Sequence, residues 1–435
     1  MNTKVSIILP SLNVVNFIED TLTSVVNQSL REIEIICVDA HSTDGTDDII
    51  KKMAAIDSRI KLVYSDKRSY GYQVNLGMSM AISPYVAIVD TDDIVPESMY
   101  EELYELAIEN DLDFIKTDYQ EFVQNENQIV LGKRVSIVDD VSLYGKIVSP
   151  RDEVGCFRDL IVASWSGIYK RSFLEELDVC HNETPGASYQ DTGFTFLAYA
   201  NAKRAMFLDK AYYLYRTDNP GSSIKDDKKM YCLCDEFSFI LNRLKNDKKI
   251  DDFKSVFCRM FYEKYKWNLE RLSAEKKAEF IKRFSQDYNN LVQMGAFSDA
   301  LLTVIERDIL RKIMIEPEVF IEEAIKTKKA FYEMVQKQDN IIIYGAGDAG
   351  VKFLNGLEIE NQMVTFAVTK ATSGLKNGLA DIPVSALNDL VKYRENSIVI
   401  VAVKVAQFEE EMTRYAKELG FTNVVNLYSG FFAFA

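Results

Sequence analysis

The sequence predicts an α/β protein in three parts: a strand-and-helix domain at 1–224, a helical accessory region at 225–335 and a small Rossmann-like α/β domain at 336–435. Three observations predict this. Apolar runs of strand length alternate with helix-period patterns in the first part. Helix-period patterns without strand signals fill the second. In the third, a strand leads into Gly-x-Gly-x-x-Gly and a helix start.

Composition limits the classes of protein. A chain of 435 residues is long enough for about three domains. The net charge of −15 argues against a nucleic-acid binder, because phosphate backbones select clustered Lys and Arg. Six dispersed cysteines and two histidines argue against a structural zinc site and fit a reducing cytoplasm. The apolar stretch 5–9 is too short for a signal peptide and no run approaches a membrane span, so we expect a soluble cytoplasmic protein.

The first part is read as βαβ units. Strands are expected at 5–9, 33–38, 60–64 and 85–89, with helices at 17–26, from Thr46, at 75–81 and from near Pro96. Right-handed crossovers between parallel strands bring their carboxyl ends to one edge of the sheet. Polar residues follow the first, second and fourth strands at that edge.

The fourth of these strands runs directly into three carboxylates, Asp90, Asp92 and Asp93. All four residues of 86–89 are apolar, which is typical of a strand covered on both faces. Carboxylates held this close repel one another unless a cation lies between them, and Mg²⁺ and Mn²⁺ select oxygen ligands. The alternative is an acidic turn that caps the next helix.

Four motifs carry a resemblance to a known family. They are V-S-I-I-L-P-S-L-N at 5–13, I-E-I-I-C-V-D-A-H-S-T-D-G-T at 33–46, S-Y-G-Y-Q-V-N-L-G at 69–77 and V-D-T-D-D at 89–93. In this order and spacing they resemble a family 2 glycosyltransferase of the GT-A fold, over residues 4 to about 224. The resemblance implies inverting transfer of a sugar from a nucleotide sugar, most commonly a UDP-sugar, with Mn²⁺ or Mg²⁺ as cofactor.

The resemblance also implies roles for single residues. Pro10 and Asn13 correspond to the loop beneath the nucleotide, and Asp39 to the carboxylate that binds its base. Asp92 and Asp93, with Asp90 beside them, match the carboxylates that bind metal and ribose. Which of Asp92 and Asp93 is the main metal ligand stays open.

The chain departs from the family pattern at four positions: Leu12, Ala40, His41 and Val74. Leu12 stands where an aromatic residue is common, Ala40 and His41 where Asp and Gly are common, and Val74 where Arg is common. Basic and aromatic residues nearby are candidates to replace those nucleotide contacts. They are Lys67, Arg68, Tyr70 and Tyr72, and Asn75 of the same motif is a further candidate for nucleotide-sugar binding.

Asp191 is the candidate catalytic base. It follows a Pro-Gly loop and begins an aromatic helix, and it matches the family's general base. An acceptor hydroxyl is a poor nucleophile, so a carboxylate that takes its proton is required by the chemistry. The alternative role is a helix cap, and one side chain can serve both purposes. Arg216 resembles the arginine that the family places near the diphosphate.

The acceptor side is predicted less sharply. Trp165 lies among small residues and could form a platform for a sugar ring, although a core aromatic is at least as good a reading. Tyr189 and Gln190, next to Asp191, are the other candidates for acceptor binding.

Helices are expected at 230–244, 253–272, 274–294, 297–314 and 317–334, and their sequences indicate no chemistry. In the last part, Gly345, Gly347 and Gly350 form a candidate nucleotide loop, with further strands at 363–368, 397–403 and 423–427. An NAD site needs an acidic residue after the second strand, and none lies between 363 and 380. A nucleotide or nucleotide-sugar module, or one that packs against a partner, is therefore favoured over redox or epimerase chemistry.

The sequence as a whole predicts a metal-dependent glycosyltransferase whose acceptor is a glycan or lipid-linked saccharide. A lipid-linked acceptor would bring the protein to the inner face of the cell membrane. The departures from the family pattern motivate one alternative, a nucleotide-sugar-binding scaffold without activity. The donor sugar, the acceptor, the linkage and any homo-oligomer are not specified.

Overall fold

A computed structural model describes residues 3–125, 128–153, 155–158, 160–221, 229–355, 362–369, 382–403 and 406–427. The chain forms two compact units, residues 1–262 and 263–435. The division between these units falls inside the predicted helical region. The predicted limits at 224 and 335 therefore stay predictions.

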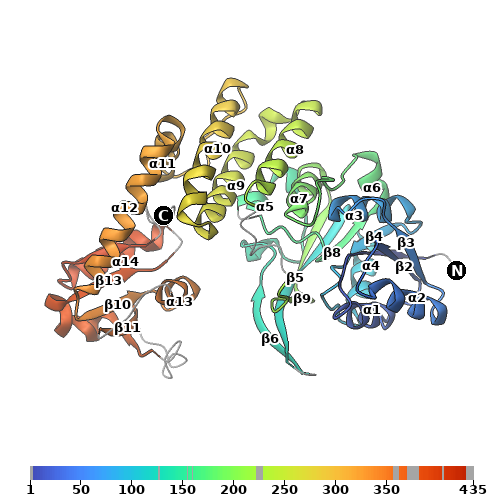
Figure 1. The fold of residues 1–435 in the computed structure, drawn as a ribbon, viewed down its shortest axis with the longest axis horizontal. Coiled ribbons are helices and arrows are strands. Elements are labelled where there is room, and N and C mark those ends of the chain that lie inside the picture. Colours follow the sequence, from blue (N-terminus) through green and yellow to red (C-terminus); the bar gives the residue numbers. More distant parts are fainter. Residues whose placement is uncertain are drawn as a thin grey trace. The chain divides into compact units, whose positions relative to one another are not determined.

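The first half of the first unit is the predicted parallel sheet. Its strands are β1 (Val5–Ser11), β2 (Ile33–Asp39), β3 (Ile60–Tyr64) and β4 (Tyr85–Ile88), in the order β3-β2-β1-β4. Every residue of β1, β2 and β4 is buried, as expected for strands covered on both faces. Helices α1 (Ile18–Val26) and α2 (Thr46–Ile56) lie on one face and α3 (Tyr70–Met80) on the other (Figure 1). This part of the prediction is confirmed.

The second half of the sheet is not apparent in the sequence. After β4 the order continues through β8 (Gly167–Lys170), β5 (Phe114–Asn125), β9 (Ala205–Arg216) and β7 (Ile147–Val148). Strand β8 is antiparallel to β4 and β5, whereas β9 is parallel to β5. Strand β6 (Gln128–Val135) pairs with β5 in a hairpin that extends away from the sheet. This mixed sheet places the end of β9 beside the loop that follows β4.

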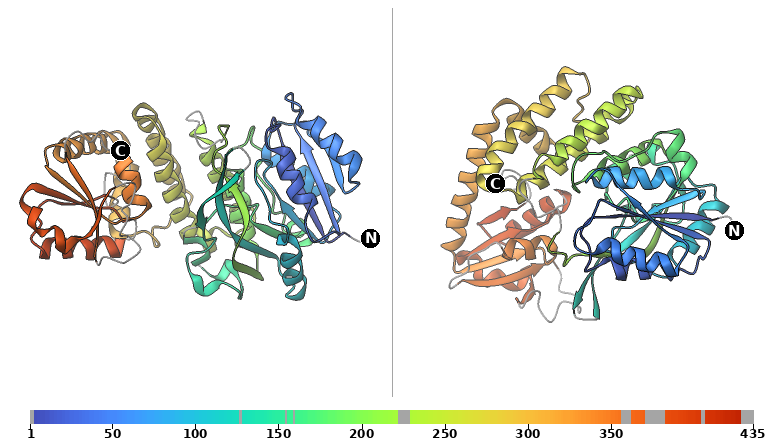
Figure 2. Two further views of the ribbon diagram at one scale, coloured as in Figure 1. Left: turned by 90° about the horizontal axis from the view of Figure 1, so that it is seen from below. Right: turned by 45° about the vertical axis from the view of Figure 1, so that its right-hand side comes forward.

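Helices cover this sheet and continue beyond it. They are α4 (Met99–Glu109), α5 (Gly155–Arg158), α6 (Arg171–Glu176), α7 (Gln190–Asn201), α8 (Cys232–Asn246) and α9 (Ile250–Arg271). Helix α7 packs against α8, and Figure 2 shows the green and yellow-green helices of this part of the chain from two further sides. An aromatic cluster joins α8 to α9, in which Phe237 contacts Phe257 and Phe261 at ring-centroid distances of 4.8 Å.

In the second unit, helices α10 (Ala274–Gln293), α11 (Val304–Ile315) and α12 (Pro317–Gln336) precede a small sheet. The helix predicted to begin at 297 begins only at Val304. Thr303 and Glu306 form a capping box there, with Thr303 N–H donating to Glu306 Oε2 (2.7 Å) and Glu306 N–H to Thr303 Oγ1 (3.2 Å). This local signal fixes the helix start better than the apolar period.

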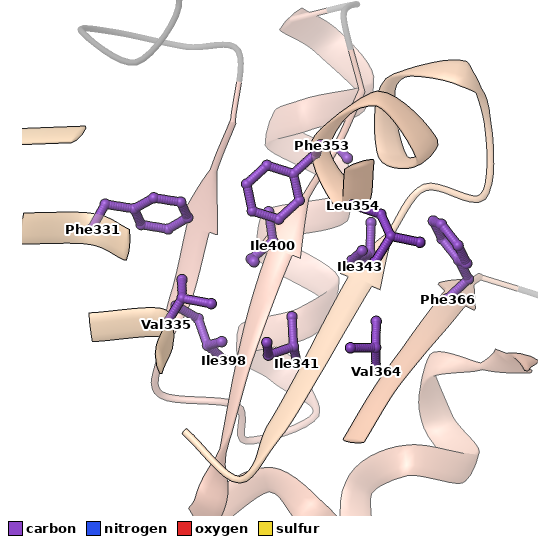
Figure 3. Close-up of a cluster of buried hydrophobic side chains, with 11 residues drawn as sticks. Phe331, Val335, Ile341, Ile343, Phe353, Leu354, Val364, Phe366, Ile398 and Ile400 are labelled. Carbon is purple, nitrogen blue, oxygen red and sulfur yellow. The ribbon is translucent and has the colours of Figure 1, made fainter. Parts of the chain in front are cut away.

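The second sheet is wholly parallel, in the order β12-β11-β10-β13-β14. Its strands are β10 (Asn340–Tyr344), β11 (Met363–Val368), β12 (Val384–Ala386), β13 (Ser397–Val401) and β14 (Val424–Asn426). Helices α13 (Asp348–Asn355) and α14 (Ala406–Glu418) complete the unit. Figure 3 shows Phe331 and Val335 of α12 packed with Phe353 of α13 over Ile341 and Ile400 of the sheet. The predicted Rossmann-like module is confirmed.

The glycine loop of this module has a packing role. Gly345 has φ +124°, and a Cβ there would lie 2.6 Å from the Ala402 carbonyl oxygen. A Cβ on Gly350 would lie 2.9 Å from the Phe366 ring. These contacts explain two of the three glycines without a ligand, so nucleotide binding by Gly345, Gly347 and Gly350 stays a prediction.

Hydropathy adds one finding. Among the residues described, each helix is either too short or too polar to span a bilayer.

Candidate functional site

The loops after β1 and β2 are tied together at the carboxyl edge of the first sheet. Asp39 is fully buried, and its carboxylate accepts hydrogen bonds from the Ser42 N–H (2.8 Å) and hydroxyl (2.6 Å). Asn13 has φ +55°, and its Oδ1 accepts from the Thr43 N–H (2.9 Å). The carbonyl of Pro10 accepts from the Thr91 hydroxyl (3.0 Å). The predicted nucleotide loop is therefore joined to both neighbouring strand ends.

The three carboxylates after β4 lie in different environments. Asp90 Oδ1 accepts a hydrogen bond from the Tyr70 hydroxyl (2.9 Å), and Asp92 Oδ2 accepts one from Asn219 Nδ2 (2.6 Å). Both residues are partly exposed. Asp93 is only 1% exposed, and its Oδ1 accepts from the Arg216 N–H (2.7 Å). Asp90 and Asp92 therefore keep some solvent exposure, whereas Asp93 is buried in the packing.

Burial and mutual repulsion act on these carboxyl groups. Burial, with the neighbouring charges of Asp92 and Asp191, raises the pKa of Asp90 to about 7, although the hydrogen bond from the Tyr70 hydroxyl lowers it. Burial, with the charges of Asp92 and Asp90, also raises the pKa of Asp93. Excess negative charge at one point favours a bound cation or protons.

The residues fit a divalent metal ion whose remaining ligands would come from a bound substrate and water. Among the described residues no three His, Cys, Asp or Glu side chains are grouped closely enough to hold a metal alone. Mg²⁺ is commonly held by one or two carboxylates plus substrate phosphates and water. Asp92 and Asp90 supply carboxylates of that kind.

Arg216 holds the carboxylate loop from below. Its Nε donates to the Asp92 carbonyl (2.7 Å) and its Nη2 to Gln124 Oε1 (2.7 Å). The guanidinium carbon lies 4.9 Å from the Phe17 ring centroid and 4.6 Å from that of Phe122. Arg216, the predicted diphosphate contact, is thus a buried cation whose Nε and Nη2 groups already donate hydrogen bonds to protein atoms.

The segment before and within α3 forms a second wall. Lys67 Nζ lies 4.2 Å from the Tyr72 ring centroid and forms an ion pair with Glu183 (2.9 Å). Asn75 donates to the His181 carbonyl and accepts from the His181 N–H, both at 2.9 Å. Asn75 therefore fixes the backbone of the later loop, while Lys67 and Tyr72 remain accessible.

Asp191 lies in the first turn of α7, partly exposed. Gln190, which is buried, donates to the Gly186 carbonyl (3.1 Å) and Thr184 Oγ1 (3.1 Å), so it orders the preceding loop. Tyr189 takes φ +65° at the helix start. The charge of Asp191 contributes to the raised pKa of Asp90, so these two carboxyl groups are close enough to interact.

Trp165 is 6% exposed and packs against tyrosines of β9. Its ring stacks on Tyr213 (4.2 Å) and Tyr215 (5.3 Å), and the Tyr119 ring meets it edge-on at 4.9 Å. Little indole surface is left for an acceptor sugar. The Tyr213 hydroxyl accepts a hydrogen bond from the Asp90 N–H (3.1 Å), so this aromatic group supports the carboxylate loop.

Sequence reasoning missed two charged residues near Asp191. Lys116 of β5 is fully buried, and its Nζ donates to the Ala163 carbonyl and to the Tyr169 hydroxyl. Burial lowers the pKa of Lys116 to about 7, while the charge of Asp191 raises it. Burial, with the charge of Asp191, raises the pKa of Glu236 of α8 to about 8. Lys116 has no sequence signal, but Glu236 interrupts the buried stripe of α8.

His181 is a buried neutral imidazole under the same loop. It stacks on Phe194 at 4.2 Å, and neither ring nitrogen has a hydrogen-bond partner among the described residues. Burial lowers the pKa of His181 to about 3. The His181 ring therefore stays neutral in the folded state at pH values below about 6.5, where the same ring is protonated in the unfolded chain.

We expect acid to destabilise the protein through His181. The contribution of the neutral ring to stability is complete above about pH 6.5 and falls as the pH drops toward 3, by roughly 2 kcal/mol at pH 5. His181→Phe keeps an aromatic ring and removes this titration. Urea unfolding at pH 8, 6 and 5 should show a smaller loss in the variant, and equal losses would refute the assignment.

Comparisons with known proteins show which sequences and folds the chain is similar to. The sequence model of glycosyl transferase family 2 matches residues 6–177. TuaG of Bacillus subtilis, whose inferred role is as a teichuronic acid biosynthesis glycosyltransferase, is 30% identical over 230 residues, which are 47% of this chain and 90% of TuaG. Glycosyltransferase GlyA of Streptococcus pneumoniae is 26% identical over 251 residues, 56% of this chain but only 35% of GlyA.

A solved structure shares the fold. S. aureus TarS 1-349 in complex with UDP-GlcNAc superposes with a TM-score of 0.54 at 19% sequence identity, over 75% of this chain and 92% of that one. The predicted GT-A fold is therefore confirmed.

Proposed function

Because the chain belongs to glycosyl transferase family 2, we propose that it transfers a sugar from a nucleotide-sugar donor, a UDP-sugar, to a hydroxyl group of a glycan acceptor with inversion. The observation that carries this proposal is the convergence of three segments at one sheet edge. They are the loop joined to Asp39, the partly exposed Asp90 and Asp92, and Asp191 on α7.

The donor side is proposed to lie over the ends of β1, β2 and β4. Pro10, Asn13 and Asp39 form the floor for the nucleotide, because their loops are fixed to one another by the hydrogen bonds of Ser42, Thr43 and Thr91. Lys67 and Tyr72 form the wall and supply the positive and aromatic groups that Leu12 and Val74 do not. Binding of UDP-GlcNAc by the structurally similar TarS supports a UDP-sugar.

Asp92 is proposed as the main ligand of Mn²⁺ or Mg²⁺, with Asp90 beside it. Asp93 is the weaker candidate, because its carboxyl group is buried and accepts from the Arg216 N–H. A divalent ion bound there would neutralise charge on the diphosphate leaving group. Arg216 would act by holding the Asp92 carbonyl and so the shape of the loop.

Asp191 is proposed as the general base. A carboxylate on the acceptor side of the sugar takes the hydroxyl proton as the oxygen attacks the anomeric carbon from the face opposite the diphosphate. The buried amine of Lys116 is a nearby group on whose pKa the charge of Asp191 acts.

The acceptor is proposed to be a glycan or lipid-linked saccharide of the cell surface. The inferred role of TuaG in teichuronic acid biosynthesis supports this class of acceptor. Tyr189 and Gln190 border Asp191, but Gln190 is buried, so Tyr189 is the better candidate for an acceptor contact. With a lipid-linked acceptor the protein would work at the inner face of the cell membrane.

A panel of nucleotide sugars tests this function. Purified protein is incubated with each donor and Mn²⁺, and released nucleotide is measured with and without EDTA. We expect slow hydrolysis of one UDP-sugar that EDTA abolishes. Tight UDP-sugar binding without hydrolysis, and without transfer to glycan acceptors, would instead support the scaffold without activity.

A further inference from the structure

The loop that carries Asp191 is closed by one side chain of α8. Glu236 Oε1 accepts a hydrogen bond from Asn182 Nδ2 (2.9 Å), and its Oε2 accepts from the Gly193 N–H (3.1 Å). Asn182 and Gly193 are the two ends of the segment 182–193, which we name the base loop. A single carboxyl group thus joins both ends of the loop.

Helix α8 approaches the base loop closely. Glu236 is fully buried. A Cβ on Gly193 would lie 2.5 Å from Glu236 Oε2 and 2.8 Å from Phe239 Cδ1. Gly193 is two residues after Asp191 in the first turns of α7, where a carboxyl group near the helix N-terminus is electrostatically favourable. The position of Glu236 therefore sets the position of the turn that carries Asp191.

Other contacts fix the middle of the base loop. Before α8, Lys229 Nζ donates to the Ala187 carbonyl (3.0 Å). On the donor side, the Gly186 N–H donates to the Arg68 carbonyl (2.8 Å) and the Tyr70 N–H donates to the Gly186 carbonyl (2.9 Å). The base loop is consequently held on two sides, by the backbone of Arg68 and Tyr70 and by the side chain of Lys229.

We propose that Glu236 is a positioning residue that holds the base loop, and with it Asp191, in the geometry for transfer. This inference rests on the function proposed above. It gives a role in transfer to α8, a helix whose sequence indicates no chemistry. The contacts on the donor side do not involve Glu236, so donor binding should survive its loss.

Three variants test the proposal in the full chain. Glu236→Ala removes both hydrogen bonds. It should lower kcat about 10- to 100-fold, because a displaced catalytic group loses the geometry needed for reaction. The affinity for UDP should change less than about 2-fold. Glu236→Gln keeps an acceptor for the Gly193 N–H and should restore kcat to within about 5-fold of wild type. Glu176→Gln makes the same change of a carboxyl group to an amide at an exposed position of α6 and should leave kcat unchanged.

If Glu236→Ala does not fold, Asn182→Ala removes one of the two hydrogen bonds without altering the buried acid, and a lower kcat with unchanged UDP affinity is expected again. Unchanged kcat in the folded variant overturns the proposal. Equal losses in kcat and UDP affinity also overturn it, because they indicate general disruption of the site.

Hydrogen exchange separates this proposal from the proposed function. Amides of the base loop should exchange faster in Glu236→Ala than in wild type, while the amides of β1 and β2 stay protected. This result does not depend on activity. A wild-type protein with no transfer would refute the proposed function alone, and unchanged exchange in the base loop would refute the role of Glu236.

Discussion

Replacing Asp191 by Asn lowers the transfer rate by about 10²- to 10⁴-fold, the usual contribution of a general base, and leaves UDP affinity within about 2-fold. The reason is that the amide keeps the size of the side chain but cannot accept the acceptor proton. The hydrogen bonds that join the loops of the donor side do not use the Asp191 side chain. The measurements are initial rates with the donor found in the panel and UDP titration by calorimetry.

Glu176→Gln is the matched control for this experiment, because it makes the same chemical change at an exposed position of α6. It should be as active as wild type. Wild-type rates in Asp191→Asn would mean that another group takes the proton, and the assignment of the base would be wrong.

Asp92→Ala should weaken Mn²⁺-dependent UDP binding by about 30-fold or more, as expected when one partner of a close charge pair is removed. Without metal, in EDTA, the variant and wild type should bind UDP equally weakly. The side chain is partly exposed, so thermal stability should change little. Binding is measured by calorimetry in Mn²⁺ and in EDTA, and unfolding by circular dichroism.

Asp93→Ala provides the contrast. Its buried carboxyl group accepts the Arg216 N–H, so its loss leaves a buried donor without its acceptor and should cost about 1–3 kcal/mol of stability. The two variants should therefore separate, with Asp92 affecting metal-dependent binding first and Asp93 affecting stability first. The reverse pattern would place the metal on Asp93.

The parallel strands and their order along the chain could be predicted from sequence because each is a short, nearly continuous apolar run. Strand β5 could not, because buried positions of this strand carry Lys116 and Asp118, residue types that sequence reasoning places at the surface. Their burial depends on partners far along the chain. Lys116 bonds to residues 163 and 169, and Asp118 accepts from Arg134 Nη2 (2.7 Å).

The site shows the same limit. Motif spacing identified Asp39, Asp90 and Asp92, which lie at the carboxyl ends of β2 and β4, and Asp191, which lies in the first turn of α7. It could not distinguish a residue that faces a ligand from one that supports the site. Trp165 and Arg216 were candidates for ligand contact, and both are buried. Trp165 packs against Tyr213 of β9, and Arg216, the last residue of β9, packs against two phenylalanines. Because β9 was not predicted, neither was the burial of these two side chains.

The link between Asp93 and Arg216 has a consequence for biosynthesis. The two residues are 123 positions apart in the chain. At a typical translation rate of about 5–20 residues per second, the carboxylate loop waits roughly 6–25 seconds for the strand that completes it. A nascent chain would thus expose β4 and its acidic loop without their partners, and the proposed nucleotide-sugar site would be complete only after β9 has left the ribosome.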